Sequence, residues 1–89
     1  MTAPPPQAHV DFAVALLFHR EHDRALAEAR RSIALAPNYA RGHLFVARIL
    51  TFSGNAAAAI KAIHASMRLD PLYRDLTLHF LAEARVSLG

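Results

Sequence analysis

The fold is decided by the stretch Ala36-Pro37-Asn38-Tyr39-Ala40, which has a counterpart later in the chain, Asp70-Pro71-Leu72-Tyr73. Pro37 and Pro71 stand 34 residues apart, and other residues recur at the same interval. The recurring pairs are Ala13 and Ala47, Leu16 and Leu50, Ala25 and Ala59, Leu26 and Ile60, Ser32 and Ser66, and Leu35 and Leu69. A period of this length, closed by a proline, predicts a repeated unit of two helices.

The composition agrees with a small helical domain that contains few large side chains. Of the 89 residues, 54% are hydrophobic and only 8% are aromatic, because alanine dominates the apolar share. Alanine favours helices, and its small side chain allows two helices to pack closely. A chain of this length is expected to form one domain.

Apolar residues recur at helical spacing in five segments, separated by polar residues, glycine and proline. The segments predict helices over residues 7 to about 20, 24–35, 39–52, 56–69 and 72–88. Asp23, Asn38 and Asn55 are the expected N-caps, because their side-chain oxygens can accept a hydrogen bond from a free backbone N–H. Residues 1–6 are expected to form a disordered, proline-rich lead-in, in which Pro6 can occupy the first turn of the first helix.

The 34-residue unit resembles the tetratricopeptide repeat. In residues 40–73 the characteristic places of that family hold Val46-Ala47, Leu50, Gly54, Ala59, Ile63, Ser66 and Pro71. In residues 6–39 they hold Phe12-Ala13, Leu16, Ala25, Ala29, Ser32 and Pro37. The chain departs from the family pattern at His9 and His43, which replace its tryptophan, and at Arg20, which replaces the turn glycine of the first unit.

The resemblance implies an all-α fold in which antiparallel helix pairs stack as a short right-handed superhelix of five helices. Residues 7–89 would form one domain, with repeats over 6–39 and 40–73 and a capping helix over 74–89. For the last helix we align Gly89 with Gly54, an offset of 35 residues. This register predicts that Ala82 faces the neighbouring helix and that Arg85 reaches water.

Charge and segment composition restrict the partners. The formal net charge of +3 and the sequence pI of about 10.2 favour acidic partners. The basic residues form no stripe, so nucleic acid is not the expected partner. No run approaches the roughly 20 apolar residues of a membrane span, and the first residues do not resemble a signal peptide. With no cysteine in the chain, we expect a cytoplasmic protein that does not contact a membrane.

No pattern in the sequence indicates catalysis or a cofactor. The three glycines form no phosphate-binding loop, and no carboxylate is paired with a histidine and a hydroxyl as in a nucleophilic site. The segment from His19 to Asp23 combines His19, Glu21, His22 and Asp23 and is the best candidate for a metal site. Because polar residues are usual between two helices, we expect no metal there. Because no catalytic pattern is present, we expect no enzyme activity.

By the resemblance, the first helix of each unit lines a concave groove. The expected partner-binding residues are Val10, Val14, Leu17, Phe18, Arg41, Leu44, Phe45, Arg48, Thr51 and Phe52, with His79, Phe80 and Glu83 added by the last helix. Val10, Val14 and Phe45 stand where chaperone-binding members hold a terminal carboxylate with lysine and asparagine, so that clamp is not expected. The expected function is a scaffold that binds a peptide or helix of a partner with apolar anchors and some acidic character.

Two alternatives stay open. The chain could self-associate as a structural module through Leu76, Phe80 and Leu88 of the last helix, which would give a homo-oligomer. Residues 70–75 and 79–84 also resemble tetratricopeptide stretches beside bacterial signalling domains, such as class III nucleotide cyclases, and in transcriptional regulators. On that interpretation the chain is a fragment of a longer array in a signalling or regulatory protein.

Overall fold

A computed structural model describes residues 4–71 and 74–88 of the chain. Within these ranges there are five α-helices and no strand. The helices are α1 (Pro6–Phe18), α2 (His22–Leu35), α3 (Ala40–Phe52), α4 (Ala56–Leu69) and α5 (Arg74–Leu88). The predicted all-α class is confirmed. No helix in the described part of the chain has both the length and the apolar character to cross a membrane.

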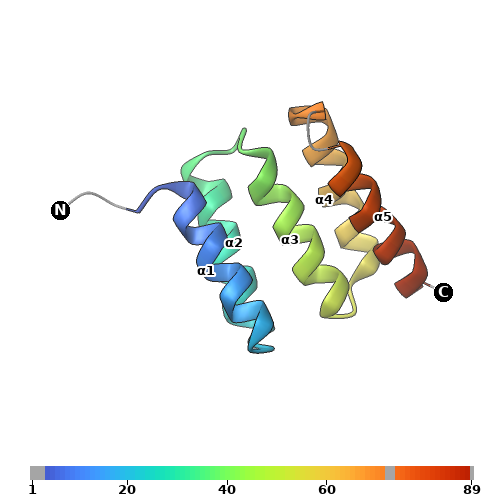
Figure 1. Cartoon of the computed structure of the whole chain (residues 1–89), viewed down its shortest axis with the longest axis horizontal. Coiled ribbons are helices and arrows are strands. Elements are labelled where there is room, and N and C mark those ends of the chain that lie inside the picture. The colour runs from blue at the N-terminus through green and yellow to red at the C-terminus, as the bar shows by residue number, and fades with distance from the viewer. Residues whose placement is uncertain (1–3, 72–73, 89) are drawn as a thin grey trace.

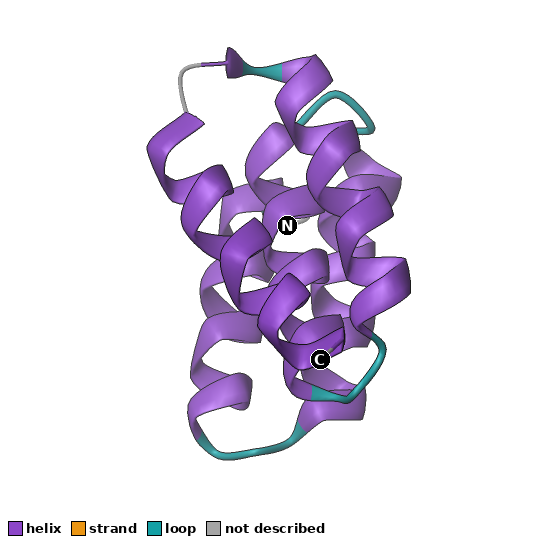
Figure 2. Ribbon diagram, turned by 90° about the vertical axis from the view of Figure 1, so that its right-hand side faces the viewer, coloured by secondary structure: helices purple, strands orange, loops and turns teal. Residues whose placement is uncertain are grey.

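The helices form two layers (Figure 1). The first layer contains α1, α3 and α5 side by side, and the second contains α2 and α4. Figure 2, seen from the side of α5, shows the connecting loops gathered at the two ends of the helices. α2 packs against both α1 and α3, and α4 packs against both α3 and α5. The second layer therefore holds the three helices of the first layer in place.

Burial follows the 34-residue period. Five pairs of residues at this interval are fully buried, with no exposed surface at either member: Val10 and Leu44, Ala13 and Ala47, Ala25 and Ala59, Ala29 and Ile63, and Ser32 and Ser66. Most of these side chains are small, which lets the helix backbones approach closely. At Gly42 of α3 an added Cβ would lie 2.6 Å from the Ser32 hydroxyl of α2. The α2–α3 contact therefore depends on the missing side chain of Gly42.

The turns within the two helix pairs have the same backbone geometry. Arg20 and Gly54, which are 34 residues apart, both adopt the left-handed conformation, with φ of 60° and 87°. In each turn the next residue donates its N–H to the carbonyl five residues earlier, as in a Schellman motif: Glu21 to Leu16 at 3.0 Å, and Asn55 to Leu50 at 2.8 Å. The period thus extends to the turns, although only the second turn contains a glycine.

Two of the three predicted helix caps are wrong. Asn55 caps α4 as expected, since its Oδ1 accepts a hydrogen bond from the N–H of Ala58 at 3.4 Å. α2, however, starts at His22, which puts Asp23 inside its first turn, and α3 follows Tyr39 rather than Asn38. Because Arg20 adopts the left-handed conformation, the turn is short. The N-cap of α2 is therefore Glu21, two residues before the predicted cap Asp23.

Pro6 lies in the first turn of α1, as the sequence allowed. Pro4 and Pro5 are exposed and lie outside the helix, but Pro6 is the first residue of α1. A proline at this position loses no hydrogen bond, because the first N–H groups of a helix have no partner within the helix. The rest of the predicted lead-in, residues 1–3, lies outside the described residues, as do residues 72–73 of the fifth predicted helix.

The predicted register of α5 is also wrong. Ala82, which was expected against the neighbouring helix, is exposed, whereas Phe80 and Ala84 are buried. The ring of Phe80 meets that of Phe45 edge to face, with centroids 5.8 Å apart. Burying this aromatic ring removes far more apolar surface from water than burying the methyl group of Ala82, so the ring sets the orientation of the helix. Arg85 is exposed, as expected.

Replacing a small buried residue by arginine tests this packing. Ala47→Arg should unfold the domain, because a charged side chain would have to enter a site with no exposed surface; we expect a cost of about 3 kcal/mol or more. Ala82→Arg makes the same change at an exposed position of α5 and should leave the melting temperature nearly unchanged. Thermal unfolding followed by circular dichroism measures both. An Ala47→Arg variant that melts like the parent would contradict the packing described above.

Exchanging glycine and a non-glycine residue should have opposite effects on stability at the two turns. Gly54→Ala should destabilise the fold by about 1 kcal/mol, because alanine is strained at a φ of 87° even though the space around it is open. Arg20→Gly should stabilise it by about 0.5 kcal/mol, since it removes that strain from the first turn. Urea unfolding gives both values. Equal stabilities of Gly54→Ala and the parent would show that the left-handed geometry is not required.

Candidate binding groove

A groove of about 630 Å³ lies between α1 and α3 and is called here the α1–α3 groove. It is lined by Val14, Leu17 and Phe18 of α1, Arg20 of the first turn, His22 of α2, and Phe45, Arg48 and Phe52 of α3. Five of these eight residues are apolar, three are basic and none is acidic. Six of the ten predicted partner-binding residues are therefore brought together: Val14, Leu17, Phe18, Phe45, Arg48 and Phe52.

Two exposed phenylalanines end the helices that form the groove. Phe18 is the last residue of α1 and is 84% exposed, and Phe52 is the last residue of α3 and is 48% exposed. Exposed aromatic side chains that cluster at a concave site commonly mark a binding surface. Each ring offers apolar area that a ligand could cover at little conformational cost.

Arg48 is held on the surface of aromatic rings. Its guanidinium carbon lies 4.7 Å from the ring centroid of Phe80 and 5.4 Å from that of Phe52. Cation–π contacts of this kind fix the side chain but do not neutralise its charge. Within the described residues, Arg48 is the one half-buried lysine or arginine that forms no ion pair. Its guanidinium can therefore donate hydrogen bonds to a carboxylate of a ligand.

Arg41, the other predicted arginine, has a different environment. It lies 5.1 Å from the ring centroid of Phe45 and 3.9 Å from a carboxylate oxygen of Asp11 on α1. Its Nε is buried and lacks a hydrogen-bond partner among the described residues. Arg41 does not line the α1–α3 groove, so its contacts link α1 to α3 rather than point to a ligand.

Two predicted contact residues belong to the core. Val10 and Leu44 have no exposed surface, so a ligand in the groove cannot touch them. Both lie on the sides of α1 and α3 that the other helices cover, and the sequence pattern did not separate these inward positions from those that face the groove. Thr51 is also nearly buried, and its hydroxyl donates to the carbonyl oxygen of Ala47 at 3.0 Å.

A second, smaller groove of about 400 Å³ lies between α3 and α5 and is called here the α3–α5 groove. It is lined by Thr51, Phe52, His79, Ala82, Glu83, Val86 and Ser87. His79 and Glu83 line it as predicted, but Phe80 is 1% exposed and cannot contribute. The predicted self-association surface loses Phe80 for the same reason, and the side chain of Leu88 lies outside the described residues.

Sequence reasoning missed Arg20 and His22 as groove residues. Arg20 was noted only as a replacement for a turn glycine, and His22 only as a candidate metal ligand. The left-handed turn brings the side chains of both residues to the end of the groove beside Phe18. The signal that could have found them is the equivalence of Arg20 with Gly54, which places Arg20 in a tight turn two residues after Phe18.

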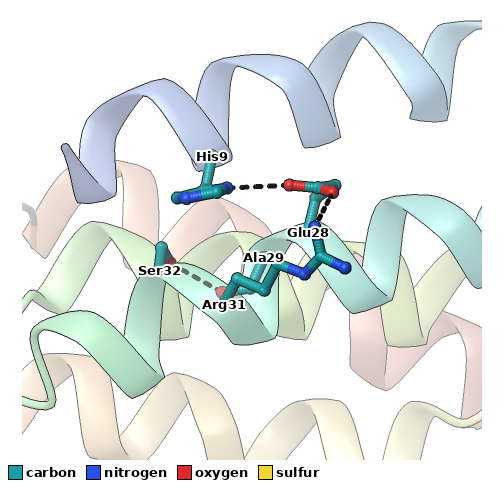
Figure 3. Close-up of polar contacts among 5 residues, drawn as sticks. All are labelled: His9, Glu28, Ala29, Arg31 and Ser32. Atoms are coloured by element: carbon teal, nitrogen blue, oxygen red, sulfur yellow. Dashed lines mark hydrogen bonds and ion pairs between the residues drawn. The ribbon is translucent and has the colours of Figure 1, made fainter. Parts of the chain in front are cut away.

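His9 and His43 make structural contacts. His9 of α1 donates from Nδ1 to a carboxylate oxygen of Glu28 on α2 at 2.8 Å, and Glu28 also accepts from Arg31 at 2.9 Å (Figure 3). His43 donates from Nε2 to the carbonyl oxygen of Pro37 at 2.9 Å. Across residues 4–71 and 74–88, no three histidine, aspartate or glutamate side chains are grouped closely enough to hold a metal ion.

Comparison with known proteins adds no family to these observations. No protein-family model matches the chain, and no curated protein matches it. The interpretation of the groove therefore rests on its own residues and their chemistry.

The groove predicts binding of a small apolar anion. Anilinonaphthalene sulfonate, whose fluorescence rises in apolar surroundings, should bind the folded protein, and Phe18→Ser should weaken that binding by about fivefold through lost apolar contact. Leu35→Ser is the matched control, because Leu35 is 53% exposed on α2 but lies outside the groove. Fluorescence titration measures both variants. A larger loss with Leu35→Ser than with Phe18→Ser would place the apolar site elsewhere.

Proposed function

We propose that this chain is a protein–protein interaction module that holds a segment of a partner protein in the α1–α3 groove. The observation that carries the proposal is Arg48, a half-buried cation without an ion pair in the described residues, at the wall of an apolar groove. The segment that fits this chemistry has large apolar side chains and at least one carboxylate. The proposal involves no reaction.

The apolar part of the groove supplies the attraction. Fully burying a leucine or phenylalanine side chain contributes about 1.5–3 kcal/mol, and Phe18, Phe45 and Phe52 offer aromatic surface to such anchors. Phe45 is largely covered by its neighbours, so little of its ring is left for a ligand to cover, whereas Phe18 extends into solvent. A ligand that covers Phe18 would gain the most, so this residue is the expected centre of the binding energy.

The basic residues supply selectivity. Arg20, His22 and Arg48 line the groove without any acidic residue, so an acidic segment is attracted and a basic one is repelled. A guanidinium presents several N–H donors in a plane and can bind both oxygens of one carboxylate. Because Arg48 already lies on two rings, less side-chain freedom is lost when the carboxylate binds.

The repeated burial pattern supports interpreting the chain as two tetratricopeptide-like repeats with a capping helix. In that architecture the first helices of the units share one face, and peptides bind along it. α1, α3 and α5 would be these helices, which agrees with the grooves that they line. On this interpretation the module is a scaffold that brings its partner to other proteins.

Selection from a library of displayed random peptides tests the proposal. With the parent protein immobilised, the selected peptides should be enriched in leucine, phenylalanine or tryptophan together with aspartate or glutamate. Arg48→Gln combined with Phe52→Ser should weaken the best peptide by at least about tenfold, because both the cation and a ring are lost. The affinity should fall as salt rises.

Circular dichroism of the double variant shows whether it stays helical. Leu35→Ser combined with Arg30→Gln serves as the control. It also removes one large apolar side chain and one cation, but from the exposed side of α2. Selected peptides that bind the folded double variant as tightly as the parent would show that the groove is not the binding site. A selection that yields no enriched peptide would count against the function itself.

A further inference from the structure

We infer that the partner segment is bipolar: its acidic part lies in the α1–α3 groove and a basic residue further along lies in the α3–α5 groove. The inference rests on the proposed function and specifies the chemistry of the partner. It follows from the way that charge changes across the face formed by α1, α3 and α5.

The two grooves form one continuous surface. Phe52 lines both of them, so its ring is the boundary that a bound segment must cross. α3 lies between α1 and α5 in Figure 1, which places one groove on each side of it. A segment anchored on Phe52 therefore reaches both grooves, and its two ends meet different side chains.

The charge of the surface reverses at this boundary. On one side Arg20, His22 and Arg48 are the ionisable residues of the lining. On the other side Glu83 is the one carboxylate of the lining, beside His79. Opposite charges on a ligand complement the two sides and penalise the reversed placement.

Glu83 is available to a basic residue of the partner. Nε2 of His79 lies 3.9 Å from one of its carboxylate oxygens. That separation is too long for a hydrogen bond. The side chains of His79 and Glu83 are 64% and 31% exposed, so a lysine or arginine of a ligand can approach the carboxylate. His79 therefore leaves the hydrogen-bonding capacity of the Glu83 carboxylate open to a ligand.

The spacing of the charges on the partner follows from helix packing. Arg48 lies on α3 and Glu83 on α5, and the axes of neighbouring helices lie about 8–10 Å apart. An extended chain advances about 3.3 Å per residue, so about three residues cover this distance. The partner segment therefore carries its acidic and basic residues about that far apart, with apolar side chains between them.

Capped fluorescent peptides of about eight residues test the inference. The bipolar peptide has aspartates at one end, leucine and phenylalanine in the middle, and lysines at the other end; it is made in both chain directions. The second peptide has glutamines in place of the lysines, and the third has glutamines in place of the aspartates. Fluorescence anisotropy should show that one bipolar peptide binds at least about threefold tighter than the second and third peptides.

Glu83→Lys distinguishes the contribution of the α3–α5 groove to binding from that of the α1–α3 groove. It should weaken the bipolar peptide by about three- to tenfold and should not weaken the second peptide, because only the first meets Glu83. Asp75→Lys is the matched control: it makes the same change of charge at an exposed position of α5 outside both grooves, and it should not distinguish the peptides. Thermal unfolding checks that both variants are folded.

The outcomes distinguish this inference from the proposed function. If the second peptide binds the parent as tightly as the bipolar ones and Glu83→Lys affects all of them equally, the inference is overturned while the α1–α3 groove remains the binding site. If the third peptide binds tightest, the charge assignment is wrong. If no peptide binds the parent protein, the proposed function fails, and the inference fails with it.

Discussion

The close approach of helices through small buried side chains is the constraint on which the rest of the structure depends. Ala25 and Ala29 of α2, Ala47 of α3 and Ala59 of α4 have no exposed surface, and Gly42 leaves room for the hydroxyl of Ser32. A core packed this closely has no space for many rings. Of the five phenylalanines, only Phe45 and Phe80 are buried, and they are buried against each other. The small core thus leaves the other three phenylalanines at the surface, where Phe18 and Phe52 line the groove.

Equivalent positions of the two 34-residue segments present different surroundings to the groove. Val14 and Arg48 occupy equivalent positions 34 residues apart, and so do Phe18 and Phe52. In α3, Arg48 lies over Phe52 and covers part of its ring; in α1, Val14 cannot do the same for Phe18. This accounts for the larger exposure of Phe18, 84% against 48%. A repeated backbone therefore presents one shielded aromatic ring and one open ring on the same face.

The sequence period predicted what depends on local spacing. It identified the five helices, the bounds of α4 and three of the five fully buried pairs, and the resemblance added six residues of the groove. The period did not predict features that depend on contacts between distant residues or on an unusual backbone conformation. The register of α5 follows from the contact between Phe80 and Phe45, which lie in different helices, and the start of α2 follows from the left-handed backbone of Arg20. The contact between Phe80 and Phe45 cannot be read from a local pattern, and the turn at Arg20 could be inferred only from its equivalence with Gly54.

The charged residues show how structural and binding roles separate in so small a protein. Glu28 accepts from both His9 and Arg31, and Arg41 lies near Asp11, so the charges between helices have partners within the described chain. Arg48, like Arg41, is half-buried, but it has two aromatic rings and no carboxylate beside it in the described residues. A half-buried cation loses part of its hydration, and cation–π contacts recover only part of that loss. A carboxylate at Arg48 would recover more, and the structure leaves the adjoining groove open for a molecule that carries one.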